Sequence, residues 1–210
     1  MRIGIISGSH RNPSQSEKIA RYAQTQLTEN GLCDEVFLFS LADNPLPFWD
    51  EGLWQGEGEG HDRWQAAIGD LRSELISCDA FIVVTPEWHG MVPSGLKNFF
   101  LLWPGSGELA HKPALIIAVS GGAGGGAYPV AELRMSSYKN SRICYLPEHL
   151  IVRNAGSVFN ENADDNDPSA QGYLHDRLMY CLEMLREYGL AFQQIRGSGK
   201  TSLETYTNGM

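Results

Sequence analysis

The stretch Arg2–Ser16, RIGIISGSHRNPSQS, sets the expectation for how the rest of this 210-residue chain folds. Its opening apolar run, Ile3–Ile6, is typical of a strand that is buried on both faces of a sheet. A loop rich in serine follows, and apolar residues then recur every four positions from Ile19 to Leu27, as on one face of a helix. The stretch therefore predicts a strand, a polar loop and a helix in direct succession.

The serine-rich loop has the donors of an anion site. The first N–H groups of the helix have no intrahelical partner and lie at the positive end of its dipole. Hydroxyls of Ser9, Ser14 and Ser16 and the planar charged fork of Arg11 can add donors. The plainer alternative is that Ser14 or Ser16 only caps the helix and that Arg11 points into water. Because the stretch lacks the lysine of a Walker A loop and the glycines of a dinucleotide fold, its donors suit one terminal phosphate.

Composition narrows the class of protein. The chain carries 16 Lys and Arg against 25 Asp and Glu, a net charge of −9, which argues against nucleic acid as the main partner. Its 4 cysteines are scattered, its start has no signal-peptide character, and no apolar run is long enough for a membrane span. These features favour a cytoplasmic protein without membrane contact. We expect one domain over residues 1–196 and a polar tail over residues 197–210.

Strands and helices alternate along the chain. Consecutive apolar runs predict strands, and apolar residues at helical spacing predict helices between them. The expected strands cover residues 3–6, 36–39, 81–84, 114–119 and 143–146, with a further extended piece over 151–159. The expected helices lie around residues 19–27, 64–75, 94–102, 128–138 and 174–185, and residues 40–62 form an irregular, aromatic-rich segment. This alternation predicts a flavodoxin-like α/β fold. Its doubly wound, five-stranded parallel sheet of order 2-1-3-4-5 would form the middle of a three-layer αβα arrangement.

Three unusual loops fall at the carboxyl ends of the expected strands. They are residues 8–16, residues 86–93 and the glycine-rich run 120–126. In a sheet of this order, ligands bind at these ends, around the point where the strand order reverses. We therefore expect the three loops to form one ligand-binding crevice. The sequence offers no histidine spacing typical of a metal site and no G-x-S-x-G nucleophile motif as a competing interpretation.

Two of these loops fit longer patterns. Gly8–Ser16 fits G-S-x-R-x-x-S-x-S, and Thr85–Asn98 fits T-P-E-Y-N-x-x-x-P-x-x-L-K-N except at Trp88 and His89. Together with the glycine loop after the fourth strand, they resemble the NADPH-dependent FMN reductase family of flavodoxin-like quinone, azo-dye and chromate reductases. The resemblance extends over about residues 2–155.

The resemblance implies an FMN cofactor, with NADPH or NADH as co-substrate. The first loop would hold the FMN phosphate and the second would run along the isoalloxazine edge. The glycine loop would approach the pyrimidine end, where its N–H groups can stabilise negative charge on the reduced ring. The implied cofactor-binding residues are Ser9, Arg11, Ser14, Gln15, Ser16, Pro86, Glu87, Trp88, His89, Gly90, Ser120, Gly121, Gly122 and Gly124. No catalytic side chain is implied.

The implied activity is a ping-pong oxidoreductase cycle. Hydride passes from the nicotinamide to flavin N5, and electrons then pass to a quinone, azo dye, free flavin or metal oxyanion. The alternative is a non-enzymatic flavodoxin-type electron carrier, although Gly8–Arg11 differs from the T-x-T-G-x-T phosphate loop of such carriers. The apolar run Phe99–Trp103 is explained either by core packing or by a subunit interface. The family resemblance favours the interface, and with it a homodimer or homotetramer.

Two departures from the family pattern bear on the site. Trp88 and His89 replace the usual Tyr-Asn pair, which keeps an aromatic surface, removes a hydroxyl and adds an imidazole. The His89 imidazole is either an ionisable group near neutral pH or a loop side chain that only bonds the backbone. Ala123 stands where many relatives have an arginine, so charge support for the reduced ring would rest on backbone dipoles alone.

Overall fold

The sheet has the strand order that the sequence predicts. The structure, a computed structural model, describes residues 1–103 and 107–209. Its parallel strands pair in the order β2-β1-β3-β4-β5. The strands are β1 (Arg2–Ser7), β2 (Glu35–Ser40), β3 (Ala80–Pro86), β4 (Pro113–Val119) and β5 (Cys144–Val152). The α/β fold class, with its flavodoxin-like order, is therefore confirmed.

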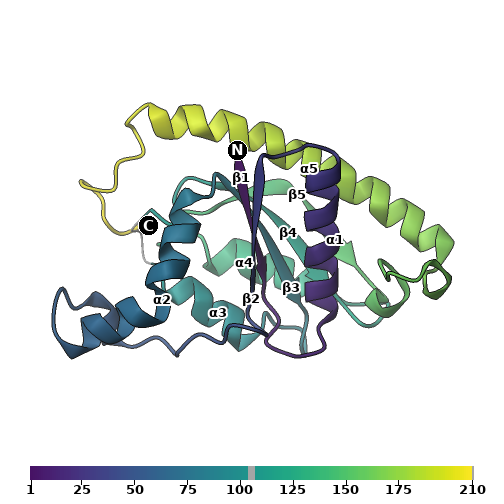
Figure 1. Ribbon diagram of the computed structural model, residues 1–210, viewed down its shortest axis with the longest axis horizontal. Helices are drawn as coiled ribbons and strands as arrows, with labels where there is room; N and C mark the ends of the chain where they lie inside the picture. The colour runs from purple at the N-terminus through teal and green to yellow at the C-terminus, as the bar shows by residue number, and fades with distance from the viewer. Residues whose placement is uncertain (104–106, 210) are drawn as a thin grey trace.

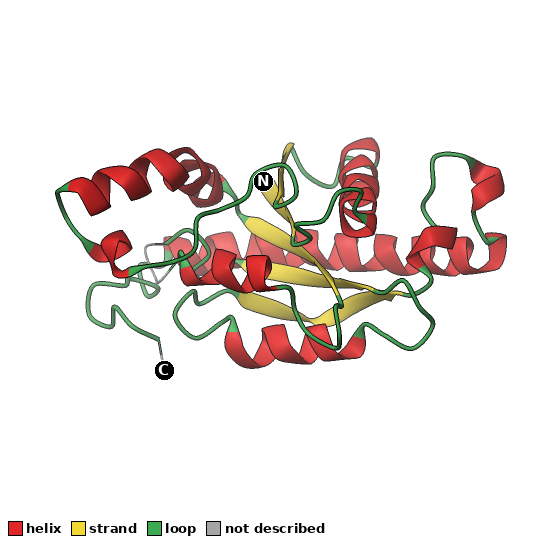
Figure 2. Ribbon diagram, turned by 90° about the horizontal axis from the view of Figure 1, so that it is seen from below, coloured by secondary structure: helices red, strands yellow, loops and turns green. Residues whose placement is uncertain are grey.

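Helices cover both faces of this sheet (Figures 1 and 2). They are α1 (Gln15–Glu29), α2 (Glu59–Ser77), α3 (Ser94–Leu101), α4 (Ala127–Ser136) and α5 (Pro168–Gly197). Short 3₁₀ turns lie at η1 (Glu51–Trp54), η2 (Ala155–Ser157) and η3 (Ala163–Asp165). The five predicted helices are all present, although α5 extends well beyond the expected residues 174–185 at both ends.

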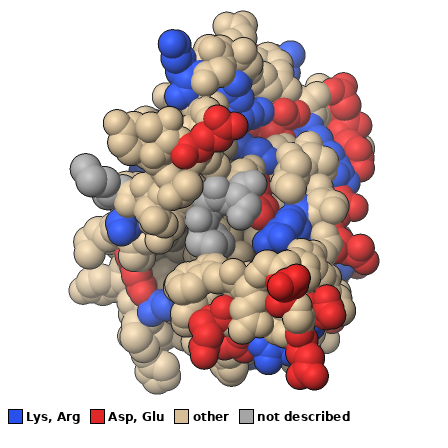
Figure 3. All heavy atoms as spheres, turned by 90° about the vertical axis from the view of Figure 1, so that its left-hand side faces the viewer, with Lys and Arg blue, Asp and Glu red and all other residues tan. Residues whose placement is uncertain are grey.

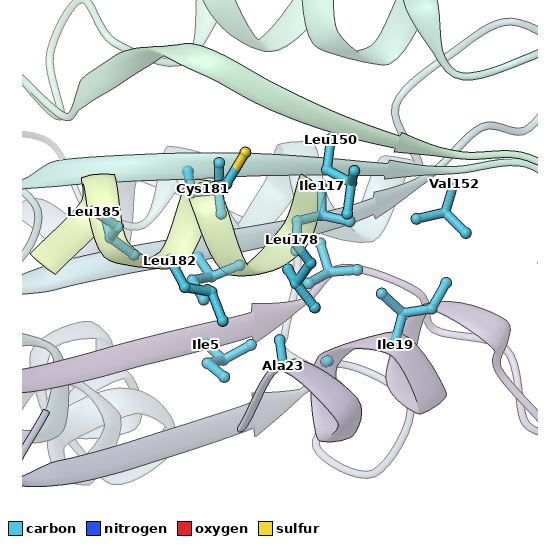
Figure 4. Packing of buried hydrophobic residues seen from close by; sticks show 14 of the residues in the cluster. Ile5, Ile19, Ala23, Ile117, Leu150, Val152, Leu178, Cys181, Leu182 and Leu185 are labelled. Carbon is cyan, nitrogen blue, oxygen red and sulfur yellow. The ribbon is translucent and has the colours of Figure 1, made fainter. Parts of the chain in front are cut away.

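Two hydrophobic clusters separate the layers. Alternate side chains of a strand point to opposite faces of the sheet, so Ile5 packs with α1 and α5 while Ile6 packs with α2, α3 and α4. Figure 4 shows the first cluster, in which Ala23 of α1 and Leu178 of α5 meet over Ile5. Because both faces of the central strands are buried, their sequences are continuous apolar runs rather than alternating ones.

The fifth strand differs from the expectation. The two predicted extended pieces, residues 143–146 and 151–159, are one strand that runs from Cys144 to Val152. It contains a shift of register against Ala114 and Ile116 of β4, at the position of Pro147. Proline cannot donate to a strand ladder and is accommodated at edge strands and bulges. Beyond Val152 the chain does not stay extended, because residues 155–157 form η2.

The aromatic-rich segment is shorter than expected. It was predicted to run irregularly over residues 40–62, but η1 lies inside it and α2 already begins at Glu59. Asp50 organises the segment: its carboxylate accepts hydrogen bonds from the Gly52 N–H at 2.8 Å and from the Trp64 indole at 3.1 Å. Asn98 of α3 holds the segment's other end by bonding the backbone of Pro47 and Trp49. The segment is therefore packed back onto α2 and α3.

The last helix ends where the polar tail was predicted to begin. Residues 198–209 contain no helix or strand, and the Arg142 guanidinium donates to the carbonyl oxygens of Tyr206 and Thr207. The division into a domain over 1–196 and a tail over 197–210 stays a prediction. Within residues 1–103 and 107–209, no helix has the length and apolar character needed to cross a membrane.

A buried lysine anchors α2 to the sheet. Lys112, the residue before β4, donates from Nζ to the carbonyls of Leu75 and Ile76 in the last turn of α2, at 2.8 and 2.9 Å. A third bond, of 2.9 Å, goes to the carbonyl of Glu108. Helix ends leave carbonyl groups without intrahelical partners, and this ammonium donates to two of them; that of Leu75 also accepts from the Cys78 N–H at 3.3 Å.

We expect Lys112→Met to destabilise the fold by about 2–4 kcal/mol, because the carbonyls of Leu75, Ile76 and Glu108 each lose a hydrogen bond from the buried ammonium. The free energy of unfolding in urea measures this loss. Lys200→Met, at an exposed position after α5, is the matched control and should change stability by less than about 0.5 kcal/mol. Equal urea midpoints for the two variants would contradict the anchoring role.

Candidate functional site

The three predicted loops meet at the carboxyl edge of the sheet. Each begins with a backbone bond to the neighbouring strand: Gly8 N–H to the carbonyl of Val84 at 2.8 Å, Glu87 N–H to Val119 at 2.9 Å, and Ser120 N–H to Val152 at 2.9 Å. In Figure 1 these ends of β1, β3 and β4 lie at the same edge of the sheet. The sheet therefore brings together the stretches that the sequence places far apart.

The loop after β1 leads into the N-terminus of α1. Ser14 is the helix cap, and its Oγ accepts from the Glu17 N–H at 3.2 Å. Ser16 is 1% exposed, and its Oγ has no hydrogen-bond partner among the described residues. Ser9 is also buried, whereas Arg11 and Gln15 are exposed. An unpartnered buried hydroxyl beside the first N–H groups of a helix fits an anion.

The segment after β3 ends in a tight two-residue turn. Trp88 and Met91 exchange backbone hydrogen bonds of 3.1 and 3.0 Å, and His89 and Gly90 between them have φ of 51° and 77°. A turn with two positive φ angles favours Asn-Gly, and histidine is among the residues that tolerate this conformation. His89 is exposed, so its position is explained by the turn. Pro86 is the buried last residue of β3.

His10, which no sequence pattern singles out, supports Trp88. The His10 and Trp88 rings meet edge to face, with centroids 4.6 Å apart. Gly95 makes room for this contact, because a Cβ there would lie 2.9 Å from His10 Nδ1. His10 lies in the first loop and Trp88 in the second, so the contact links the two. Its position between Ser9 and Arg11 was the only sequence signal for it.

The glycine loop contains glycines of two kinds. A Cβ at Gly121, Gly122 or Gly124 would meet no atom within 4 Å, so the loop is open on that side. A Cβ at Gly126 would instead collide with Ile151, and its φ of 102° disfavours any other residue. Gly121, Gly122 and Gly124 are among the site residues predicted from the sequence, and the structure leaves space beside them for a ligand.

Side chains from two other loops fix the glycine loop. The Glu87 carboxylate accepts from the Gly126 N–H at 2.5 Å, which joins the loop after β3 to the start of α4. Arg153, directly after β5, donates from Nε to the carbonyl of Gly125 at 2.9 Å. The guanidinium of Arg153 thus adds positive charge at this loop, where the sequence had indicated backbone dipoles alone. Its location on a different loop explains why the local pattern around Ala123 did not reveal it.

Glu132 of α4 binds the backbone of Val92, the residue after the Trp88–Met91 turn. Its carboxylate accepts from the Val92 N–H at 2.7 Å and pairs with Lys97 Nζ at 2.5 Å. Burial alone would raise the pKa of this carboxyl, but the bonds from Lys97 and Val92 outweigh it and hold the pKa below its usual value. Glu132 is therefore ionised at neutral pH and keeps the turn fixed against α4.

Similarity to known proteins was found in both sequence and structure. Residues 1–157 match the family model described as NADPH-dependent FMN reductase. An NADPH azoreductase from Bacillus sp. (strain OY1-2) is 25% identical over 199 residues, which cover 93% of this chain and 97% of the relative. A quinone reductase from Pseudomonas putida is 28% identical over 169 residues, which cover 79% and 84%. FerB, a flavoenzyme NAD(P)H:(acceptor) oxidoreductase from Paracoccus denitrificans, has a similar fold, with a TM-score of 0.66, 20% identity and coverage of 91% and 98%.

The two kinds of glycine should respond differently to substitution. We expect Gly126→Ala to lower stability by about 2 kcal/mol or more, because its positive φ and the contact with Ile151 leave no room for a methyl group. For a chain of this size that loss lowers the melting temperature by about 4–8 °C. Gly122→Ala, which meets open space, should leave the melting temperature within about 1–2 °C. Equal losses in both variants would show that this distinction is wrong.

Proposed function

Because this chain belongs to the NADPH-dependent FMN reductase family, we propose that its three loops hold FMN at the carboxyl edge of the sheet. The chain is an oxidoreductase of FMN-dependent type, as the family and the azoreductase and quinone reductase relatives indicate. When bound, FMN supplies a ring that accepts hydride from NADPH or NADH and passes electrons to an acceptor. The protein's own residues bind and orient the reactants.

The observation that carries the proposal is the buried Ser16 hydroxyl, which lacks a partner among the described residues at the N-terminus of α1. A terminal phosphate supplies the acceptors that this hydroxyl and the first N–H groups need. Ser9, Ser14, Gln15 and Arg11 complete the phosphate subsite in this proposal. Ser14 Oγ is already an acceptor in the helix cap, so its hydroxyl proton is the part that remains for the ligand.

The ring of the cofactor would lie between Trp88 and the glycine loop. Trp88 supplies a flat apolar surface that His10 holds in place. The N–H groups of Glu87, Trp88, Ser120 and Gly122 are taken by protein acceptors. Polar contacts to the ring would therefore come from the N–H groups of His89, Gly90, Gly121 and Gly124 and from the carbonyls of this edge, including that of Pro86. These N–H groups have no protein partner among the described residues.

We propose a ping-pong cycle in which the nicotinamide leaves before a quinone, azo dye, free flavin or metal oxyanion takes the electrons. The open side of the glycine loop, at Gly121, Gly122 and Gly124, gives both reactants access. An electron carrier of flavodoxin type is the other candidate. Anaerobic addition of NADPH or NADH to the FMN-loaded protein distinguishes them: an enzyme loses the yellow flavin absorbance, and a carrier keeps it with both reductants.

We also propose that the chain is a homodimer or homotetramer. Of the apolar run Phe99–Trp103, three residues are buried core, but Leu101 is 56% exposed. It lies on a groove of about 610 Å³ between α3, α4 and the aromatic-rich segment, which also includes Trp49, Trp54 and Phe100. Trp54 is 64% exposed. Exposed apolar side chains around a groove are typical of interfaces, and sedimentation velocity tests whether the chain associates.

The phosphate subsite makes a specific prediction for substitutions. We expect Ser16→Ala to weaken FMN binding about tenfold and Arg11→Met about 10–100-fold, because each removes a hydrogen bond to a charged phosphate. Quenching of flavin fluorescence measures both affinities. Arg186→Met is the control, since this partly exposed arginine on α5 pairs with the adjacent Glu187, and it should leave the affinity unchanged. Unchanged affinity in both test variants would place the phosphate elsewhere.

A further inference from the structure

Lys18, in the first turn of α1, makes an unusual set of contacts. Its Nζ donates to the carbonyl of Ala155 at 2.7 Å, to the carbonyl of Val158 at 2.8 Å and to Asn160 Oδ1 at 2.7 Å. An ammonium group has three donors, so all of them are used. The acceptors are neutral, and no carboxylate pairs with Lys18 in the described part of the chain. The lysine is therefore a fixed connection rather than a mobile surface charge.

The residues that Lys18 holds also support the glycine loop. The Ala155 N–H donates to the carbonyl of Ser120 at 3.1 Å, and the Asn154 N–H donates to the carbonyl of Gly122 at 3.3 Å. On its other side, the Lys18 backbone N–H bonds the carbonyl of Ser14 at 3.2 Å. A continuous series of hydrogen bonds thus runs from the loop after β1, through Lys18 and Ala155, to the loop after β4.

The two loops that this series joins belong to strands that are not neighbours, because β3 lies between β1 and β4. In Figure 4, Ile19, which follows Lys18 in the chain, and Val152, which lies shortly before Ala155, are at the same end of the hydrophobic cluster. Both Ala155 and Val158 are fully buried. The distance between the proposed phosphate subsite and the open glycines is therefore set partly by one side chain.

We propose that Lys18 is a positioning residue that fixes the serine-rich loop relative to the glycine loop, and thereby sets how tightly the reduced cofactor is held. This inference rests on the proposed FMN site. Lys18 would not touch the ring; it acts through Ala155 and Ser120. Reduced flavin carries more negative charge at its pyrimidine end than oxidised flavin, so a displaced glycine loop weakens the reduced form more.

The test compares Lys18→Met with wild type in two measurements: the dissociation constant of oxidised FMN and the midpoint potential of bound FMN. We expect oxidised FMN to bind about tenfold more weakly and reduced FMN about 100-fold more weakly. That tenfold difference between the two forms makes the two-electron potential about 30 mV more negative. Lys18→Arg, which keeps charge and donors, should recover at least half of the shift.

Arg21→Met is the matched control, because Arg21 lies on the same helix and pairs only with Glu17 in the described structure. It should change neither quantity. Equal weakening of the oxidised and reduced forms, with an unchanged potential, would show that Lys18 has only a general stabilising role and would overturn the inference. An unchanged affinity and potential in Lys18→Met would overturn it as well.

A second readout does not depend on flavin. In the protein without cofactor, the amide of Ala155 should exchange with solvent about tenfold faster in Lys18→Met than in wild type, because its partner loop is no longer held. Unchanged exchange overturns the positioning role even if FMN binds elsewhere. If wild type binds no FMN but this exchange increases, the proposed function fails while the connection between the loops stands.

If Lys18→Met does not fold, Lys18→Gln, which keeps two amide donors, replaces it. This variant should also speed exchange of the Ala155 amide, by a smaller factor, and unchanged exchange would overturn the positioning role of Lys18.

Discussion

The site depends on the backbone ladder of the parallel sheet extending one residue past its strands. Gly8, Glu87 and Ser120 each donate to a carbonyl of the next strand, so each loop leaves the sheet in a fixed direction. The strands themselves are held by two apolar clusters, one on each face. Loops that carry polar ligand contacts can be exposed and still well placed, because their first residues belong to a rigid layer.

An anionic ligand in a chain of net charge −9 requires local rather than global attraction. Figure 3 shows one face of the molecule, on which Asp and Glu side chains gather at the right and lower edges beside separate Lys and Arg side chains. Charges farther apart than about 10 Å are largely screened at physiological salt. In the proposed site, the N-terminus of α1 and Arg11 therefore attract the phosphate end, and Arg153 adds positive charge at the glycine loop.

The sequence was sufficient for the fold because its signals are local and repeated. Buried parallel strands require unbroken apolar runs, and these identified β1 to β4 within one or two residues at each end. The single strand β5 was predicted as two separate pieces. Its continuity across Pro147 becomes evident only from its pairing with β4, where the register shifts. His10 and Arg153 were missed for a related reason: their roles come from contacts with Trp88 and Gly125 across the sheet edge, which no spacing along the chain encodes.

Comparison of FMN with riboflavin tests most directly whether the loop after β1 is a phosphate subsite. The two ligands share the ring and differ only in the terminal phosphate, so their dissociation constants, measured by fluorescence quenching of the same protein, isolate that contact. The expected result is FMN binding tighter by about 100-fold or more, since two charge-assisted hydrogen bonds are worth about 3 kcal/mol or more. Equal affinity for the two ligands would contradict the proposed site.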